Sequence, residues 1–178
     1  AEYGVGTSEL VVLAAAGKPV VLLAPIFQHS PLVLLVRADS GIWSAHDVVG
    51  KRVAIEPQAA ELLAYLQREG VALNKLARQA HGGTVEALQN GKVDALSAYR
   101  TDEPFELQQA KVAYLSLDPR MGGIDFYGDT LFTTQTELRD RPDRVAALRN
   151  AVLRGWRWAL AHPTESIDLL WHRYSQRH

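Results

Sequence analysis

Patterns typical of strands and helices alternate along almost the whole chain of 178 residues. Apolar runs of strand length, Val20–Ile26 and Leu32–Arg37, are rich in valine and leucine, as in strands that are covered on both faces. Helical patterns with recognisable ends lie between such runs. The first begins near Thr7 and Ser8, where a hydroxyl is placed to cap it, and ends at Gly17. This alternation predicts an α/β fold with parallel sheets and covering helices.

The same criteria give the remaining elements. The other expected strands are Tyr3–Gly6, Gly50–Ile55, Val93–Ala98 and Lys111–Leu117. The other expected helices are Ala59–Glu69, Val85–Asn90, Pro142–Ala161 and, after a break at His162-Pro163, Thr164–Tyr174, with Thr164 and Glu165 as its cap. Tryptophans lie at helical spacing among leucines and alanines in the C-terminal helices, and we expect them to pack in the core: Trp156, Trp158 and Trp171.

The composition limits the possible functions. The chain has 19 basic and 20 acidic side chains, so it lacks the basic stripe of a nucleic-acid-binding protein. It has no cysteine, which excludes disulfides, thiolate metal sites and cysteine nucleophiles and fits an oxidising compartment. No apolar run reaches the roughly 18 residues of a membrane span. No metal-ligand spacing or cofactor motif is present, and we expect neither a metal nor a cofactor.

Two polar loops carry groups suited to a ligand. The loop Asp125–Asp129 holds two carboxylates, a phenol and a glycine, and such groups on a rigid α/β scaffold usually serve binding. The alternative is a surface turn in which the aspartates cap the backbone. The stretch Gln28–Pro31 lies between two apolar strands, at a place where open α/β sheets bind small molecules. Its alternative is a polar turn shaped by proline.

A third polar segment, Tyr99–Pro104, follows the strand Val93–Ala98. We expect Pro104 to hold Glu103 in an extended conformation, with its carboxylate directed into a cleft as an acceptor for ligand N–H groups. An ion pair between Glu103 and Arg100 is the alternative.

Another acid, Glu56, follows the strand Gly50–Ile55 and precedes the helix that Gln58 opens, and we expect it to line the cleft. The alternative is that this segment is a simple helix start. Taken together, the presumed cleft holds four carboxylates and two tyrosine rings, namely Glu56, Asp102, Glu103, Asp125, Tyr99 and Tyr127. Carboxylates beside aromatic rings favour a ligand that is flat and donor-rich or cationic, rather than a phosphate or sulfonate.

Six short motifs occur in an order that resembles one family. They are Gly4–Ser8, Ile26–Pro31, Thr101–Pro104, Asp125–Asp129, Arg154–Trp156 and Ala161–Pro163. Together they resemble the thiamine-pyrimidine-precursor-binding family of type II periplasmic binding proteins, and in particular the sensor-domain branch attached to bacterial signalling proteins. The family usually reads Glu-Pro-Gly-Ser where this chain has Glu56 to Ala59, so a hydroxyl contact is lost there and the pocket is expected to be narrower.

The resemblance implies two α/β lobes joined by two hinge strands that close on a small ligand. Residues 1–37 and 99–178 would form the first lobe, and residues 38–98 the second. The family has a further βαβα segment ahead of Tyr3, so we expect the first lobe to be incomplete on its N-terminal side. The ligand-binding residues implied are Thr7, Ser8, Gln28, His29, Ser30, Glu56, Tyr99, Thr101, Glu103, Asp125 and Tyr127.

The expected function is that of a periplasmic solute-binding or sensor domain for a thiamine-related pyrimidine or similar ligand. Lobe closure would be relayed to an attached histidine kinase or diguanylate cyclase domain, or to an ABC permease. One alternative is a structural, homodimeric domain with a vestigial pocket, because an incomplete lobe exposes apolar surface. The other is a thiamine-pyrimidine biosynthetic enzyme, which is disfavoured because the cysteine-rich iron motif of that branch is absent.

Overall fold

The computed structural model describes residues 2–79 and 85–175, and the chain divides into two compact units. The smaller unit comprises Ala1–Gly4, Pro19–Ala24 and Leu131–His178, and the larger unit comprises Val5–Lys18 and Pro25–Thr130. These boundaries differ from those of the predicted lobes, because residues 5–18, 25–37 and 99–130 are grouped with the segment 38–98. For residues 25–37 and 99–130 the reason is strand pairing, described next.

The larger unit is built on a five-stranded sheet of order β5-β4-β6-β3-β7. β4 (Arg52–Ala54) runs parallel to β5 (Ala77–Gln79) and to β6 (Ala95–Tyr99). β3 (Leu32–Arg37) runs antiparallel to β6 and to β7 (Tyr114–Leu117). The predicted α/β class is confirmed, and the predicted parallel pairing holds for β5, β4 and β6, whereas β3 enters the sheet in the opposite direction.

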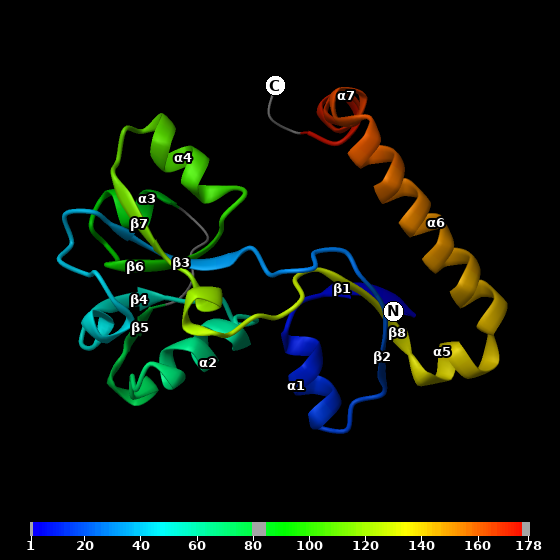
Figure 1. Ribbon diagram of the computed structural model, residues 1–178, viewed down its shortest axis with the longest axis horizontal. Coiled ribbons are helices and arrows are strands. Elements are labelled where there is room, and N and C mark those ends of the chain that lie inside the picture. The colour runs from blue at the N-terminus through cyan, green and yellow to red at the C-terminus, as the bar shows by residue number, and fades with distance from the viewer. Residues whose placement is uncertain (1, 80–84, 176–178) are drawn as a thin grey trace. The chain divides into compact units, whose positions relative to one another are not determined.

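Helices cover both faces of this sheet, as Figure 1 shows. Leu34 of β3 packs in a core with side chains of α2 (Ala60–Arg68). Leu35, which points to the opposite face, packs in a second core with side chains of α3 (Val85–Gln89) and α4 (Glu103–Gln109). Alternate residues of one strand thus supply two cores, which explains why β3 is an uninterrupted apolar run.

Most of a three-stranded sheet of order β1-β8-β2 belongs to the smaller unit. Its strands are β1 (Tyr3–Gly6), β8 (Thr130–Thr134) and β2 (Val20–Pro25). The helices that follow β8 are α5 (Gln135–Asp140), α6 (Pro142–Ala161) and α7 (Pro163–Arg173). The larger unit also has α1 (Glu9–Ala15) and the short 3-10 helices η1 (Ala45–Val48), η2 (Leu73–Lys75) and η3 (Pro119–Gly122).

Several elements were not predicted, among them β8, β5 and α4. The strand β8 was not assigned, although threonine and phenylalanine, which are both enriched in strands, make up four of its five residues. The three-residue strand β5 is too short to give a periodic signal. The helix α4 was missed because Pro104 was expected to hold Glu103 in an extended conformation. Proline is tolerated in the first turn of a helix, where its missing N–H has no intrahelical partner.

Several local expectations are wrong. The Ser8 hydroxyl makes no capping hydrogen bond to α1. The last helix begins at Pro163 after His162, so Thr164 is not its cap. Leu22 of β2 is 51% exposed, so that strand is not covered on both faces. The three tryptophans of α6 and α7 are 42–49% exposed, since these helices bury few side chains against the described residues.

Candidate functional site

Three of the predicted polar segments meet at one edge of the five-stranded sheet. Because β3 is antiparallel to β6, with Leu32 opposite Tyr99, the start of β3 lies at the edge where β6 ends. The backbone N–H of Arg100 donates to the Pro31 carbonyl at 2.9 Å, which ties the two loops together. From the end of β4, the backbone N–H of Glu56 donates to the Ser97 hydroxyl at 2.9 Å. The sheet therefore brings the segments around residues 30, 56 and 99 side by side.

Tyr99 is the centre of the acidic part of this site. Burial raises the pKa of its phenol to about 12, and four nearby carboxyl groups, Glu56, Asp129, Glu61 and Glu103, raise it further where they are ionised. These acids come from four different segments: the end of β4, the loop before β8, α2 and α4. Two of them, Glu56 and Glu103, are predicted site residues, whereas Asp129 and Glu61 are not.

Glu103 lies in the helix α4 rather than in an extended segment, so the predicted conformation is wrong. Its carboxylate accepts a hydrogen bond from the backbone N–H of Tyr99 at 2.7 Å, which fixes the turn between β6 and α4. Arg100 forms its ion pair with Asp118 and not with Glu103. Glu103 therefore shapes the turn that follows Tyr99, in addition to its place among the acids of the site.

The loops Ile26–Pro31 and Asp125–Asp129 are joined to each other. The backbone N–H of Ser30 donates to the Phe126 carbonyl at 2.8 Å, and that of Gly128 donates to the Phe27 carbonyl at 3.0 Å. A Cβ atom at Gly128 would lie 2.9 Å from the Cβ of Phe27, so this close approach requires glycine.

His29 and Asp125, predicted separately from these two loops, form a pair. The Nδ1 of His29 lies 3.0 Å from both carboxylate oxygens of Asp125. The Nε of Arg120 is 3.5 Å from the same carboxylate. All three side chains are about half exposed, so this group lies at the surface of the site.

The remaining predicted residues have different places. The hydroxyl of Thr7 donates to the Gln58 carbonyl at 3.4 Å, which joins the start of α1 to the start of α2. Gln28 makes a local hydrogen bond to the Pro25 carbonyl at 3.3 Å. Ser8 is buried, and the Tyr127 side chain is 56% exposed. Thr7 and Ser8 thus lie near the start of α2.

The most buried acid near the site, Glu61, was not singled out from the sequence. It is 2% exposed and accepts a hydrogen bond from the hydroxyl of Ser30. The available signal was its position within the apolar stripe of α2, directly beside Leu62 and four residues before Tyr65, both of which are buried. An acid on the buried face of an amphipathic helix needs a specific partner.

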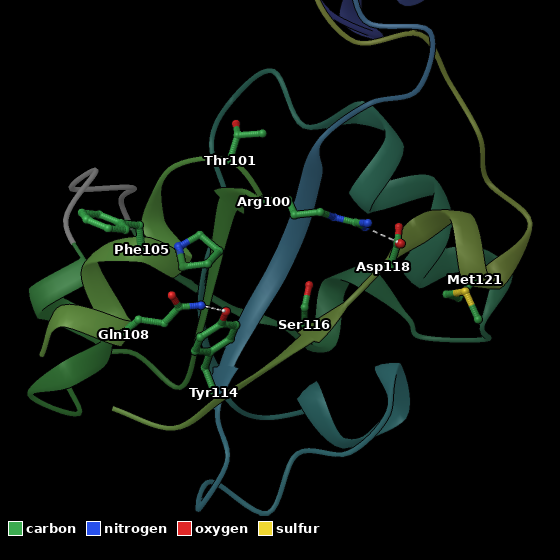
Figure 2. Close-up of a pocket in the computed structure, with 9 residues that line it drawn as sticks. Arg100, Thr101, Phe105, Gln108, Tyr114, Ser116, Asp118 and Met121 are labelled. Atoms are coloured by element: carbon green, nitrogen blue, oxygen red, sulfur yellow. Dashed lines mark hydrogen bonds and ion pairs between the residues drawn. The ribbon is translucent and has the colours of Figure 1, made fainter. Parts of the chain in front are cut away.

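A separate open pocket of about 570 Å³ lies on the α4 side of the larger unit (Figure 2). Thr101 is the one predicted site residue in its lining, which is otherwise formed by Arg100, Pro104, Phe105, Gln108, Tyr114, Ser116, Asp118 and Met121. The Gln108 amide donates to the Tyr114 hydroxyl at 3.1 Å. Arg100 and Asp118 neutralise each other in the pocket, so it presents no unpaired charge from this pair.

Within residues 2–79 and 85–175, no group of three histidine, aspartate or glutamate side chains is placed to hold a metal ion. In the same ranges, none of the helices combines the length and the apolar character needed to cross a bilayer.

A protein-family model described as NMT1/THI5 like matches residues 1–166 of the chain. A comparison with curated protein sequences gives no match. Among solved structures, the periplasmic aliphatic sulphonate-binding protein SsuA of Escherichia coli superposes with a TM-score of 0.75 at 17% identity, covering 96% of this chain and 60% of that protein.

Two other solved structures are similar. The alkanesulfonate-binding protein SsuA of Xanthomonas axonopodis pv. citri, bound to MOPS, has a TM-score of 0.66 at 16% identity, over 96% of this chain and 61% of its own. A substrate-binding protein of an ABC uptake transporter from Streptococcus pneumoniae, with bound histidine, has a TM-score of 0.55 at 14% identity, over 87% and 61%. At these identities the likeness establishes the fold, which is the predicted type II periplasmic-binding-protein fold. The chain spans about 60% of the length of these proteins.

Proposed function

The chain belongs to the NMT1/THI5-like family, and from this premise we propose that it is a solute-binding module for a flat small molecule that is cationic or rich in N–H donors. The observation that carries the proposal is the gathering of three carboxyl groups, those of Glu56, Asp129 and Glu103, around the phenol of Tyr99. Carboxylates form strong charge-assisted hydrogen bonds with N–H donors, and an aromatic ring adds a stacking or cation–π contact. A thiamine-related aminopyrimidine has this chemistry.

The charges near the site favour this ligand class over an anion. The sulphonate-binding proteins share the fold, but an anionic ligand needs unpaired cations or backbone donors. Among the described residues near the site, Arg100 faces Asp118, and both Arg120 and the imidazole of His29 face Asp125. The acids around Tyr99 would repel a sulfonate.

Calorimetry on the full chain tests the proposal with three ligands: an aminopyrimidine, thiamine and a short alkanesulfonate. We expect the first or second to bind and the alkanesulfonate not to bind. Glu56→Gln removes one negative charge at nearly constant volume and should weaken binding about tenfold, the equivalent of about 1.4 kcal/mol. The matched control is Glu86→Gln on α3, where the side chain is exposed and the affinity should stay unchanged.

Two results would contradict the proposal. Binding of the alkanesulfonate alone would assign the site to anions. Failure of every ligand in a folded chain would favour a structural domain with a vestigial pocket.

We further propose that the ligand-bound form acts through a larger assembly outside the cytoplasm, since the structurally similar proteins are periplasmic or belong to ABC transporters. The receiving partner would be an ABC permease or an attached histidine kinase or diguanylate cyclase domain. In either case ligand binding would shift the population of the form that the partner recognises. Co-purification with the protein encoded by a neighbouring permease gene, dependent on the aminopyrimidine, would distinguish the permease from an attached output domain.

A further inference from the structure

The carboxyl group of Glu61 is the most deeply buried titratable group at the site. It lies in the first turn of α2 and is 2% exposed. An ionised carboxylate in such a place is strongly disfavoured unless a cation pairs with it. No ion pair of Glu61 is found within residues 2–79 and 85–175.

Two serine hydroxyls face this carboxyl group from different segments. Ser30, just before β3, donates a hydrogen bond to its Oε1. Ser8, just before α1, is directed at the same group. However, Ser8 Oγ and Glu61 Oε2 are both buried and neither has a hydrogen-bond partner. A buried polar atom without a hydrogen-bond partner destabilises the fold.

The titratable groups around Glu61 are acidic. The phenol of Tyr99 on β6 is close enough to sense the charge of Glu61, and Glu56, Asp129 and Glu103 act on that same phenol. A negative charge on Glu61 would add to this cluster, which further disfavours ionisation. A proton on Oε2 removes the charge and makes this oxygen a donor that faces the Ser8 hydroxyl, which itself lacks a partner.

We propose that Glu61 is held in its protonated form and is a positioning residue. Its carboxylic acid group joins Ser8, Ser30 and α2 next to the site. The ligand half of this inference rests on the proposed function. If a carboxylic acid joins these segments, ionisation loosens them, so ligand affinity falls as the pH rises. Glu61 acts on the ligand through the segments it holds, since its own oxygen Oε2 is buried.

The direction of the titration agrees with this geometry. Burial raises the pKa of the Glu61 carboxyl above its ordinary value of 4.5, against the opposing effect of the Ser30 and Ser8 hydroxyls. When the pKa of a group is higher in the folded state than in the unfolded state, protonation of that group stabilises the folded state. This stabilisation is complete below the unfolded-state pKa. That contribution is lost as the pH rises through the folded pKa.

The proton can be observed without any ligand. In the full chain labelled with ¹³C at glutamate side chains, the Glu61 carboxyl resonance is assigned by its absence in Glu61→Gln and followed against pH. We expect its midpoint to lie above 4.5, because burial disfavours the ionised carboxylate. A midpoint at or below 4.5 in the wild type would overturn the proposal, because both hydroxyls would then be donating to an ionised carboxylate.

Binding tests the positioning role. Glu61→Gln keeps an N–H donor for Ser8 and an acceptor for Ser30, so its affinity for the aminopyrimidine should match the wild type at low pH. As the pH rises through the Glu61 midpoint, the wild type should lose affinity for the aminopyrimidine. Glu61→Gln has no titrating group at this position and should not show this loss. Glu61→Ala should weaken binding about tenfold at all pH values, through the loss of both hydrogen bonds. Titration of the ligand itself affects wild type and Glu61→Gln equally.

The outcomes separate the two proposals. If the aminopyrimidine binds neither protein while Glu61 titrates above 4.5, the proposed ligand is wrong and the buried proton stands. If Glu61→Gln and the wild type lose affinity in parallel over the whole pH range, the positioning role is wrong.

Discussion

At the residue scale, two buried glutamates illustrate how surroundings decide the state of the same side chain. Glu61, in the larger unit, faces two serine hydroxyls and no cation within the described residues. Glu137, in the smaller unit, accepts hydrogen bonds from the Tyr3 hydroxyl at 2.8 Å and from Arg144 Nε at 2.6 Å. Burial alone would raise the pKa of the Glu137 carboxyl, but Arg144 and Tyr3 together outweigh it and the pKa is lowered.

Replacement of Glu137 by glutamine should lower the melting temperature by a few degrees at neutral pH, because the ionic hydrogen bond to Arg144 is lost. A lowered folded-state pKa contributes stability that is present above the unfolded pKa and is lost as the pH falls through the folded value. The difference between wild type and variant should therefore shrink on acidification. Thermal unfolding followed by circular dichroism between about pH 7 and pH 3 measures it.

The matched variant is Glu61→Gln. Because the pKa of the Glu61 carboxyl is raised, the difference in stability between wild type and this variant should change as the pH rises and not as it falls. If the Glu137 difference instead grew toward low pH, the assignment of an ionised Glu137 would be wrong.

At the element scale, glycines mark where two elements touch and where one is unpartnered. In η3, a Cβ atom at Gly122 would lie 2.5 Å from the ring of Tyr65 on α2, so the contact between these elements requires a residue without a side chain. In the interior of α6, a Cβ atom at Gly155 would meet nothing within 4 Å. The same substitution should thus have opposite effects at the two positions.

We expect Gly155→Ala to stabilise the chain by about 0.5–1 kcal/mol, because glycine is a poor residue for a helix interior. Gly122→Ala should destabilise it by about 1–3 kcal/mol, because the Tyr65 ring must move. Urea unfolding of the two variants beside the wild type gives both values. Shifts of the same sign would show that one of the two surroundings is described incorrectly.

The elements also show how far sequence patterns reach. The strand β3 was predicted with its exact bounds, because burial on both faces leaves an unbroken apolar run. The bounds of α6 were predicted equally well, from the prolines at positions 142 and 163. By contrast, the start of α4 at Glu103 depends on the hydrogen bond from the Tyr99 N–H to its carboxylate, which local propensity does not contain.

At the scale of the whole molecule, the C-terminal helices leave a large apolar surface exposed. The side chains of α7 that recur at helical spacing, with Tyr174 just beyond its end, form one stripe: Ile167, Leu170, Trp171 and Tyr174. They line an open groove of about 370 Å³ together with Ser175. Contiguous exposed apolar surface of this kind promotes association.

The chain alone should therefore self-associate as its concentration rises, and sedimentation velocity can follow this. The double variant Ile167→Glu, Trp171→Glu places charges on the stripe and should sediment as a monomer at concentrations where the wild type does not. Asp168→Asn, outside the stripe, is the control and should behave like the wild type. A wild-type chain that remains monomeric at every concentration would contradict the prediction of a homodimer.

The sequence by itself determined the α/β class, the long strands and helices, and the polar loops that follow strand ends, since these depend on hydrophobic period and on turn residues that are local in the chain. Tertiary structure alone decided which loops meet. The antiparallel entry of β3 brings Ser30 to the edge where Tyr99 lies. The contact between two loops pairs His29 with Asp125 across 96 positions of sequence. Tertiary structure also decided that Glu61 belongs to the site, because burial and the choice of partner depend on the packing of distant segments.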